Sequence, residues 1–348
     1  MLLRDDRTIA RVTTRLEFFA ATGDAVARVR SEDGQGLTAT MALQGSGAQC
    51  VAVDSRNPRR VYAGTFDDGI FRTRDAGETW EQLSHGLPHA RILSVAISPS
   101  ERSADDSVVY AGTEPSALYR SDDDGRSWDP LPALNDVPSA PTWSFPPRPW
   151  TSHVRWIACH YTDPGVLFVG IELGGVMRTR DGGLTWDDRK PGSYADSHVV
   201  LTHPIAPERV YEAAGDGVAM SADVGETWEP VDEGMEHHYA WGLAVDPTDP
   251  DLWFVSAAPG PMQAHGRRGD ARAGLYRKRG AAPWERLGGS HGLPRTLSTM
   301  PYALLAPPEH PGTLVAGFHN GELLITRDAG ESWDRLDVRL PGIVALSG

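Results

Sequence analysis

The chain has 348 residues, of which 40% are hydrophobic, so it can bury a substantial core. Its formal net charge is −14 at pH 7, and acidic residues are spread along the whole sequence, which argues against a nucleic-acid partner. No segment has the length and apolar composition of a transmembrane helix, and Met1 to Ala10 lack the apolar run of a signal peptide. We therefore expect no membrane association and a cytoplasmic location.

In chain order, short apolar segments alternate with turns that are rich in Gly, Pro and Asp, as in all-β proteins. Two strands are expected first, at 16–22 and 25–30. Seven further segments have the character of inner strands: 50–54, 94–98, 156–160, 199–203, 242–246, 302–306 and 343–347. Small side chains such as Ala52 and Ala158 stand near the middle of these segments, and strands that crowd around a central axis need small side chains there.

Five segments share the pattern Ser/Thr-x-Asp-x-Gly-x-Thr/Ser-Trp, and we call them the box segments. They occupy 73–80, 121–128, 179–186, 221–228 and 326–333. Gly allows the unusual backbone angles of a tight turn, while Asp and Ser/Thr accept hydrogen bonds from exposed backbone N–H groups. We therefore predict a structural role, and no chemistry, for Asp75, Asp123, Asp181, Asp223 and Asp328.

The box segments resemble the repeats of BNR/Asp-box propellers, a family that includes sialidases, xyloglucanases, sortilin-type receptors and a photosystem assembly factor. The resemblance covers nearly the whole chain and is specific for fold rather than activity. It implies a seven-bladed β-propeller in one domain, 1–348, with each box between the third and fourth strands of a blade. Two degenerate boxes complete the count, one at Ser31-Glu-Asp33-Gly34 and one that keeps only Tyr276, Gly280 and Trp284.

The ring is expected to close by pairing the last strand, 343–347, with the N-terminal strands, which removes an exposed sheet edge. The only two cysteines, Cys50 and Cys159, fall on inner strands of non-adjacent blades, so no disulfide is expected between them. Free thiols fit a reducing compartment.

Loops on the face opposite the box turns should converge at the mouth of the central channel. The connections between blades on this face are 84–91, 132–155, 191–198, 232–241 and 288–300. The turns within blades are 66–68, 114–117, 172–175, 257–274 and 319–321. Nine of the twelve histidines fall in these loops: His85, His89, His153, His198, His237, His238, His265, His291 and His319. Histidines gathered in a cleft indicate a functional site.

The first hypothesis for the mouth is a site that binds or hydrolyses a small or carbohydrate-like molecule. Glu114 and Glu172 are the predicted acid–base pair, with His198 as the third catalytic residue. The predicted substrate-binding residues are Trp143, Trp150, His153, Arg155, His238, Tyr239, Trp241 and His319. The Pro-rich loop 138–153 either offers flat aromatic surface to such a ligand or packs as a lid over the third blade.

Two other hypotheses remain open. A divalent metal would be a cofactor held by mouth histidines, with His153, His198, His238 and His319 as candidate ligands. Alternatively, the propeller is a non-catalytic platform for a protein partner. Sialidase activity is not expected, because the nearest match to the Arg-Ile-Pro motif of sialidases is Arg91-Ile92-Leu93, without the Pro.

Overall fold

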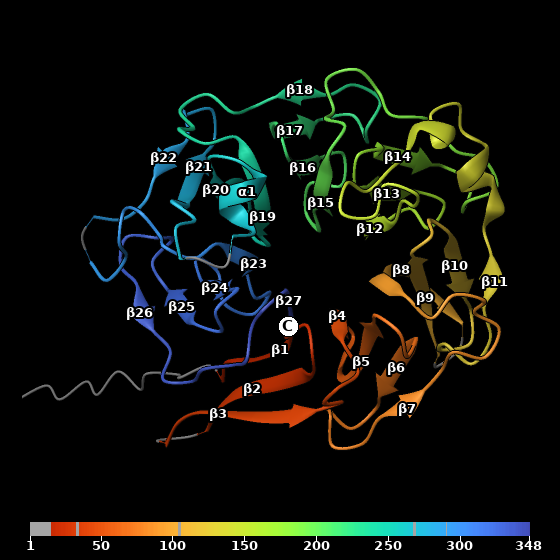
Figure 1. The fold of residues 1–348 in the computed structure, drawn as a ribbon, viewed down its shortest axis with the longest axis horizontal. Coiled ribbons are helices and arrows are strands. Elements are labelled where there is room, and N and C mark those ends of the chain that lie inside the picture. Colours follow the sequence, from red (N-terminus) through yellow and green to blue (C-terminus); the bar gives the residue numbers. More distant parts are fainter. Residues whose placement is uncertain (1–14, 33–34, 104–105, 267–268, 290) are drawn as a thin grey trace, which may run out of the picture.

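The structure, a computed structural model, describes residues 15–32, 35–103, 106–266, 269–289 and 291–348. Seven small antiparallel sheets stand around one axis (Figure 1), so the predicted seven-bladed β-propeller is confirmed. Six sheets have four strands, and the seventh has three strands and one isolated bridge between Arg178 and Asp187. Residues 1–14 and the pair Asp33-Gly34 of the first degenerate box lie outside the described residues.

Each blade is a meander that runs from the axis outward. The innermost strands are β27 (Ala345–Ser347), β4 (Ala48–Asp54), β8 (Ile92–Ser103), β12 (Val154–Cys159), β15 (Ser197–Thr202), β19 (Tyr239–Asp246) and β23 (Pro301–Leu305). The second strands are β1 (Glu17–Ala21), β5 (Asn57–Thr65), β9 (Asp106–Thr113), β13 (Leu167–Ile171), β16 (Val210–Ala214), β20 (Asp249–Ala258) and β24 (Leu314–Phe318). The second strands form the most continuously buried layer, with β13, β16 and β24 buried along their whole length.

The outer half of each blade is shorter and more exposed. The third strands are β2 (Val26–Glu32), β6 (Ile70–Thr73), β10 (Leu118–Ser121), β14 (Gly175–Thr179), β17 (Gly217–Ser221), β21 (Gly274–Arg279) and β25 (Leu323–Thr326). The fourth strands are β3 (Gln35–Ala42), β7 (Glu81–Gln82), β11 (Asp129–Pro130), β18 (Glu229–Pro230), β22 (Glu285–Arg286) and β26 (Asp334–Arg335). Most of these fourth strands are two exposed residues long, which leaves little edge for pairing with another chain.

The two ends of the described chain share one blade, as predicted. Strand β27 pairs antiparallel with β1, in the register Phe19 with Ser347 and Ala21 with Ala345. Figure 1 places the C-terminus near the centre of the ring, beside β1. The final strand starts at Ala345, two residues later than expected, although the Val344 amide already donates to the carbonyl of Ala21 on β1 at 2.9 Å.

The box segments form the turns between third and fourth strands, and their side chains satisfy the turn backbone. In the 73–80 box, Oδ1 of Asp75 accepts hydrogen bonds from the Thr79 amide at 2.9 Å and the Thr73 hydroxyl at 2.7 Å. The Gly77 amide donates to Thr73 Oγ1 at 2.9 Å, and Gly77 has a φ of +91° that favours glycine. The same bonds recur in the other four boxes, which confirms the predicted structural role of the box carboxylates.

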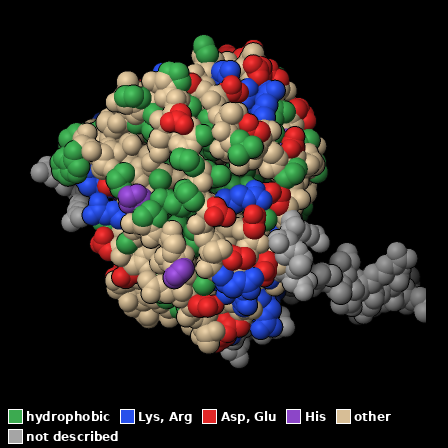
Figure 2. All heavy atoms as spheres, turned by 90° about the vertical axis from the view of Figure 1, so that its right-hand side faces the viewer, with side chains coloured by type: hydrophobic (Ala, Val, Ile, Leu, Met, Phe, Trp, Pro, Cys, Tyr) green, Lys and Arg blue, Asp and Glu red, His purple; other side chains and the backbone are tan. Residues whose placement is uncertain are grey.

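Arginines on third strands connect neighbouring blades at the box turns. Nη1 of Arg178 donates to the carbonyl of Val224 at 2.9 Å, and Nη1 of Arg277 donates to that of Ala329 at 2.6 Å. Each of these carbonyls belongs to the box of the next blade, so the two contacts hold neighbouring blades together. On the side of the ring shown in Figure 2, acidic and basic side chains lie next to one another in mixed groups.

Helical structure is confined to loops: η1 (Pro132–Asp136), η2 (Ala140–Thr142) and α1 (Pro261–Ala264). Within the described ranges, no helix has the length and apolar character needed to cross a membrane. Cys50 lies on β4 and Cys159 on β12, and both thiols are free.

Candidate functional site

A cavity of about 880 Å³ opens at the channel mouth, on the face opposite the box turns. Its walls come from the first residues of inner strands and from the loops around the mouth. The lining residues are Gln49, Phe66, Leu93, Phe145, Pro146, Pro147, Arg148, His153, Arg155, Glu172, Leu173, Asp196, Tyr239, Trp241, Pro261, Met262, His265, Gly266, Tyr302 and Val344. The volume and the mixture of aromatic walls with a few charged groups are typical of small-molecule sites.

A repeated β-bulge positions one side chain per blade at this mouth. Six inner strands shift register near their first residues, each leaving one residue without a partner across the ladder. The residues at these bulges are Gln49, Leu93, Arg155, His198, Trp241 and Tyr302. All but His198 line the cavity. A bulge turns a side chain away from the regular alternation of the strand, so the same irregularity aims successive blades at one space.

One wall of the cavity is a packed group of rings centred on Trp241. The indole lies 4.4 Å from the ring of His198, 4.6 Å from His265 and 5.4 Å from Tyr302, between ring centroids. Arg155 places its guanidinium 4.7 Å from the centroid of the Trp241 ring. The stacking holds a flat apolar surface and a cation at fixed positions inside the mouth.

The loop that contains α1 is held over this wall by a chain of hydrogen bonds. His265 Nε2 lies 2.8 Å from the Tyr239 hydroxyl, and its Nδ1 lies 2.6 Å from the Tyr302 hydroxyl. Desolvation by the surrounding rings lowers the pKa of His265 from 6.5 to about 4. The imidazole is therefore neutral at pH 7, and one of its nitrogens donates while the other accepts.

Next to this ring wall, one end of the cavity carries charge. Oε2 of Glu172 lies 3.1 Å from Nε2 of His153 and 3.9 Å from Nε of Arg155. Burial alone would raise the pKa of Glu172, but the hydrogen bond and charge of His153, with the charge of Arg155, bring it to about 2. Glu172 is thus a carboxylate at neutral pH, held by its partners.

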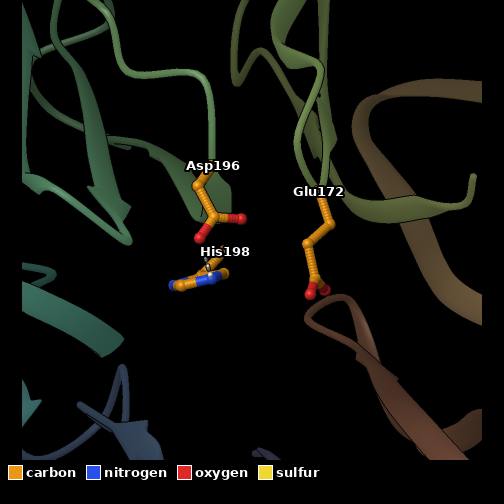
Figure 3. Close-up of side chains that lie close together, drawn as sticks. All are labelled: Glu172, Asp196 and His198. Atoms are coloured by element: carbon orange, nitrogen blue, oxygen red, sulfur yellow. Dashed lines mark ion pairs between the residues drawn. The ribbon is translucent and has the colours of Figure 1, made fainter. Parts of the chain in front are cut away.

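Asp196 and His198 face Glu172 across a short gap (Figure 3). Nδ1 of His198 donates to the carbonyl of Ala240 at 2.6 Å, while Nε2 lies 3.5 Å from Oδ2 of Asp196. His198 is fully buried, and Nε2 has no hydrogen-bond partner among the described residues. One atom from each of Glu172, Asp196 and His198 lies within 4.8 Å of the other two.

Of the predicted acid–base pair, only Glu172 lines the cavity, although both carboxylates contact His153, Glu114 at 3.9 Å and Glu172 at 3.1 Å. Glu114 is buried behind the cavity wall, where it accepts hydrogen bonds from Nε and Nη2 of Arg148 at 2.6 and 2.5 Å. Arg91 adds a third contact at 3.2 Å. Burial raises the pKa of Glu114, but Arg148 outweighs that effect, and the pKa lies below its ordinary value. Glu114 therefore positions Arg148, and Arg148 lines the cavity instead of Glu114.

Two of the predicted aromatic residues do not line the cavity. Trp143, just after η2, packs into the core of the third-blade region, and its indole N–H donates to the Ser139 hydroxyl at 3.0 Å. Trp150 is 80% exposed to solvent. Part of the 138–153 loop thus serves packing, while Phe145 and His153 from the same loop reach the cavity and contact each other at 4.7 Å.

Besides His198, two more of the predicted histidines lie outside the cavity lining. The side chain of His238 is half exposed and lies 3.9 Å from Asp232. Strand β19 begins at Tyr239, and because side chains alternate along a strand, His238 and Tyr239 do not share a direction. His319 is exposed and stacks on Tyr302 at 4.7 Å, on the rim. The predicted set of four metal-binding histidines is therefore not assembled.

Several lining residues had no role in the sequence-based site. Asp196, Arg148 and Tyr302 are the most consequential of them. Tyr302 could have been found, because its place at the start of an inner strand matches that of Trp241. Asp196 stands two residues before His198, a spacing that puts both side chains on one side of an extended chain. Arg148 gave no such signal, since its position depends on the path of a long loop.

Comparison with solved structures shows which known proteins share this fold. No family model matches the chain, and no curated protein matches it. Among solved structures, a GH74 enzyme from Niastella koreensis aligns with a TM-score of 0.64 at 14% identity, covering 95% of this chain and 54% of that one. The GH74 xyloglucanase from Xanthomonas campestris aligns with a TM-score of 0.60 at 16% identity, covering 92% and 46%.

A third structure, YCF48 bound to D1 peptide, aligns with a TM-score of 0.55 at 17% identity, covering 93% of this chain and 85% of that one. The chain shares their propeller fold. It spans about half the length of the GH74 structures, and at these identities the likeness concerns the fold alone. The resemblance to the BNR/Asp-box family stays a prediction.

Proposed function

We propose that this propeller binds a small carbohydrate-like molecule in the channel-mouth cavity. The observation that carries the proposal is the pairing of a ring wall at Trp241 and Tyr302 with ionised groups at Arg155, Glu172 and Asp196 in one space of about 880 Å³. Ring faces suit the apolar C–H face of a sugar, and fixed carboxylates and guanidinium groups suit its hydroxyls. The GH74 neighbours, one of them named as a xyloglucanase, are consistent with such a ligand.

A more specific version of this proposal is that the cavity also hydrolyses the bound sugar. Glu172, with a pKa of about 2, fits a nucleophile or base and does not fit a general acid at neutral pH. Asp196 is the second carboxylate of the cavity, and an oxygen of each lies within 4.8 Å of the other. That upper limit is compatible with the roughly 5 Å between the carboxyl groups of retaining glycosidases.

The proposal is tested by a thermal-shift screen of mono- to tetrasaccharides, followed by calorimetry on each hit. We expect Trp241→Ala and Arg155→Ala to weaken binding by at least about 10-fold, the effect of losing one anchoring contact of ~1.4 kcal/mol. His238→Ala, outside the cavity, should bind as the wild type does. A panel without hits, or hits that bind all variants equally, would contradict a sugar site at the mouth.

Hydrolysis is tested separately from binding, by measuring the release of reducing ends. Release of reducing ends from a bound oligosaccharide should fall by about 100-fold or more in Glu172→Gln, the usual loss when a general acid, base or nucleophile is removed. If binding persists and no reducing ends appear, the cavity binds without cleaving.

A protein-binding platform is the second candidate function. The YCF48 structure holds a peptide and matches this chain over most of the length of both chains, unlike the longer GH74 enzymes. A peptide would use the same mouth, with its terminal carboxylate at Arg155. Fluorescence anisotropy with a library of labelled C-terminal peptides tests this alternative, and binding that survives Arg155→Ala would contradict it.

A further inference from the structure

We infer that Glu172, Asp196 and His198 form a binding site for one divalent transition-metal ion, of the zinc type, at the charged end of the channel-mouth cavity. The inference goes beyond the proposed function, because a cation would bind there with or without a sugar. Its three ligands come from two adjacent blades, as Figure 3 shows, with Glu172 on the turn after β13 and the other two at the start of β15.

The inference depends on which ring nitrogen of His198 holds the proton. A carbonyl oxygen can only accept, so the 2.6 Å contact with Ala240 places the proton of a neutral imidazole on Nδ1. Nε2 then presents a lone pair, and at 3.5 Å it faces Oδ2 of Asp196, which also presents lone pairs. Nε2 is buried and has no hydrogen-bond partner among the described residues. Two electron-rich atoms directed at one point need a positive charge between them, which either a proton on Nε2 or a bound metal ion supplies.

The spacing fits a metal ion. Bonds of about 2.1 Å from a metal to nitrogen and oxygen donors place neighbouring donors roughly 3 to 4 Å apart. The separation of His198 and Asp196 meets this requirement as it stands, and all three ligand atoms lie within 4.8 Å of one another. A shift of the Glu172 carboxylate by roughly 1 to 2 Å, from a change of its side-chain rotamer, would bring the third ligand into that range.

Neighbouring residues supply the support that metal ligands need. His153 holds Glu172 at 3.1 Å, and the Ala240 carbonyl holds the His198 ring, as outer-shell partners do in metal sites. Arg155, 3.9 Å from Glu172, reduces the net negative charge of the site. Glu172 and Asp196 still offer two carboxylates to the cation, and Arg155 and His153 are the positive groups beside Glu172. Glu172 and Asp196 line the cavity, so the remaining coordination positions face it.

The test is calorimetric titration of the full-length chain with ZnCl₂ and, separately, MnCl₂, after chelator treatment and removal of the chelator. We expect one ion per chain. Asp196→Asn and Glu172→Gln should weaken its binding by about 100-fold, because each removes a charged ligand and keeps the side-chain shape. His238→Ala is the matched control, since it removes a histidine of the same face that lies outside the site.

The burial of His198 makes His198→Ala a risk for folding, so near-UV circular dichroism must accompany that variant. Absence of stoichiometric binding would overturn the inference and leave a protonated His198 as the positive charge. Equal binding by wild type and Asp196→Asn would also overturn it, as would a loss in His238→Ala as large as that in Asp196→Asn. Sugar binding is measured in the presence of chelator, so failure of the metal site and failure of the proposed function are separate results.

Discussion

The guanidinium of Arg155 lies 4.7 Å from the ring centroid of Trp241, although the two residues come from β12 and β19, with the blade of β15 between them. Both stand at β-bulges, and both line the cavity. This contact therefore depends on the arrangement of three successive blades around the axis. The site is a product of the seven-blade geometry and not of any single blade.

The box carboxylates should affect stability and leave the mouth unaffected. Asp181 accepts hydrogen bonds from the amide and hydroxyl of Thr185, at 2.9 and 2.6 Å, in an exposed turn. Asp181→Ala should lower the free energy of unfolding by about 1 kcal/mol, like the loss of a capping residue, as measured by urea denaturation. Normal stability combined with lost ligand binding would show that the two faces are assigned wrongly.

Asp124 should be a much more sensitive position than Asp181. It is completely buried and bonds to Tyr62 at 2.5 Å, Arg74 at 2.6 Å and Arg72 at 2.8 Å, so it joins two blades. Removal of one partner from a buried charge network leaves uncompensated charge, and Asp124→Ala should cost about 3 to 5 kcal/mol. A loss below about 1 kcal/mol in urea denaturation would mean that water or rearrangement compensates the arginines.

Replacement of Trp143 and of Trp150 should change the free energy of unfolding by very different amounts. Trp143 is 9% exposed and belongs to a core cluster, whereas Trp150 is 80% exposed. Trp143→Ala should lower the free energy of unfolding by about 3 kcal/mol or more, and Trp150→Ala by less than about 0.5 kcal/mol. Equal effects in chemical denaturation would contradict the packing of the 138–153 loop.

A fall in pH should destabilise the protein through protonation of His265. The folded-state pKa of about 4 lies below the ordinary value of 6.5, so the folded protein binds fewer protons than the unfolded chain between these values. The associated stability is present above pH 6.5 and is lost as the pH falls toward 4. His265 is solvent-accessible, so we expect less than about 1 kcal/mol after screening. The measurement is the urea midpoint from pH 7 to 4.5, with His265→Gln as control, and an identical pH profile in both proteins would refute the assignment.

Neither thiol should react in the folded protein. Burial raises the pKa of Cys50 to about 12, although the Gly64 backbone and the Arg155 charge oppose this, and burial also raises that of Cys159. Because the thiolate is the reactive form, a chromogenic disulfide reagent should titrate no thiol at pH 7.5 in buffer and two in urea. Rapid reaction in buffer would place a cysteine at the surface.

The sequence predicted what local chemistry controls. The box segments carry their own turn-forming bonds, so Asp75 and its equivalents could be assigned a structural role from spacing alone. The repeat register likewise placed Arg155, His198 and Trp241 at the start of inner strands. Those positions follow from the periodicity of the fold and needed no knowledge of the loops.

What the sequence could not predict depends on long-range packing. Glu114 occupies the same repeat position as Glu172, yet Arg148 covers it, and the position of Arg148 follows from the path of a long loop anchored by Trp143. His238 was misplaced because the strand starts at Tyr239, and a shift of one residue reverses the direction of a side chain.

We expect ligand to bind at the channel mouth and not on the face that carries the box turns. Hydrogen–deuterium exchange of the full-length chain, with and without a ligand found in the screen, distinguishes these two faces. We predict protection confined to 145–155, 172–175, 196–198 and 261–266, the segments that line the cavity. Protection of the box segments, with the mouth unchanged, would contradict the account.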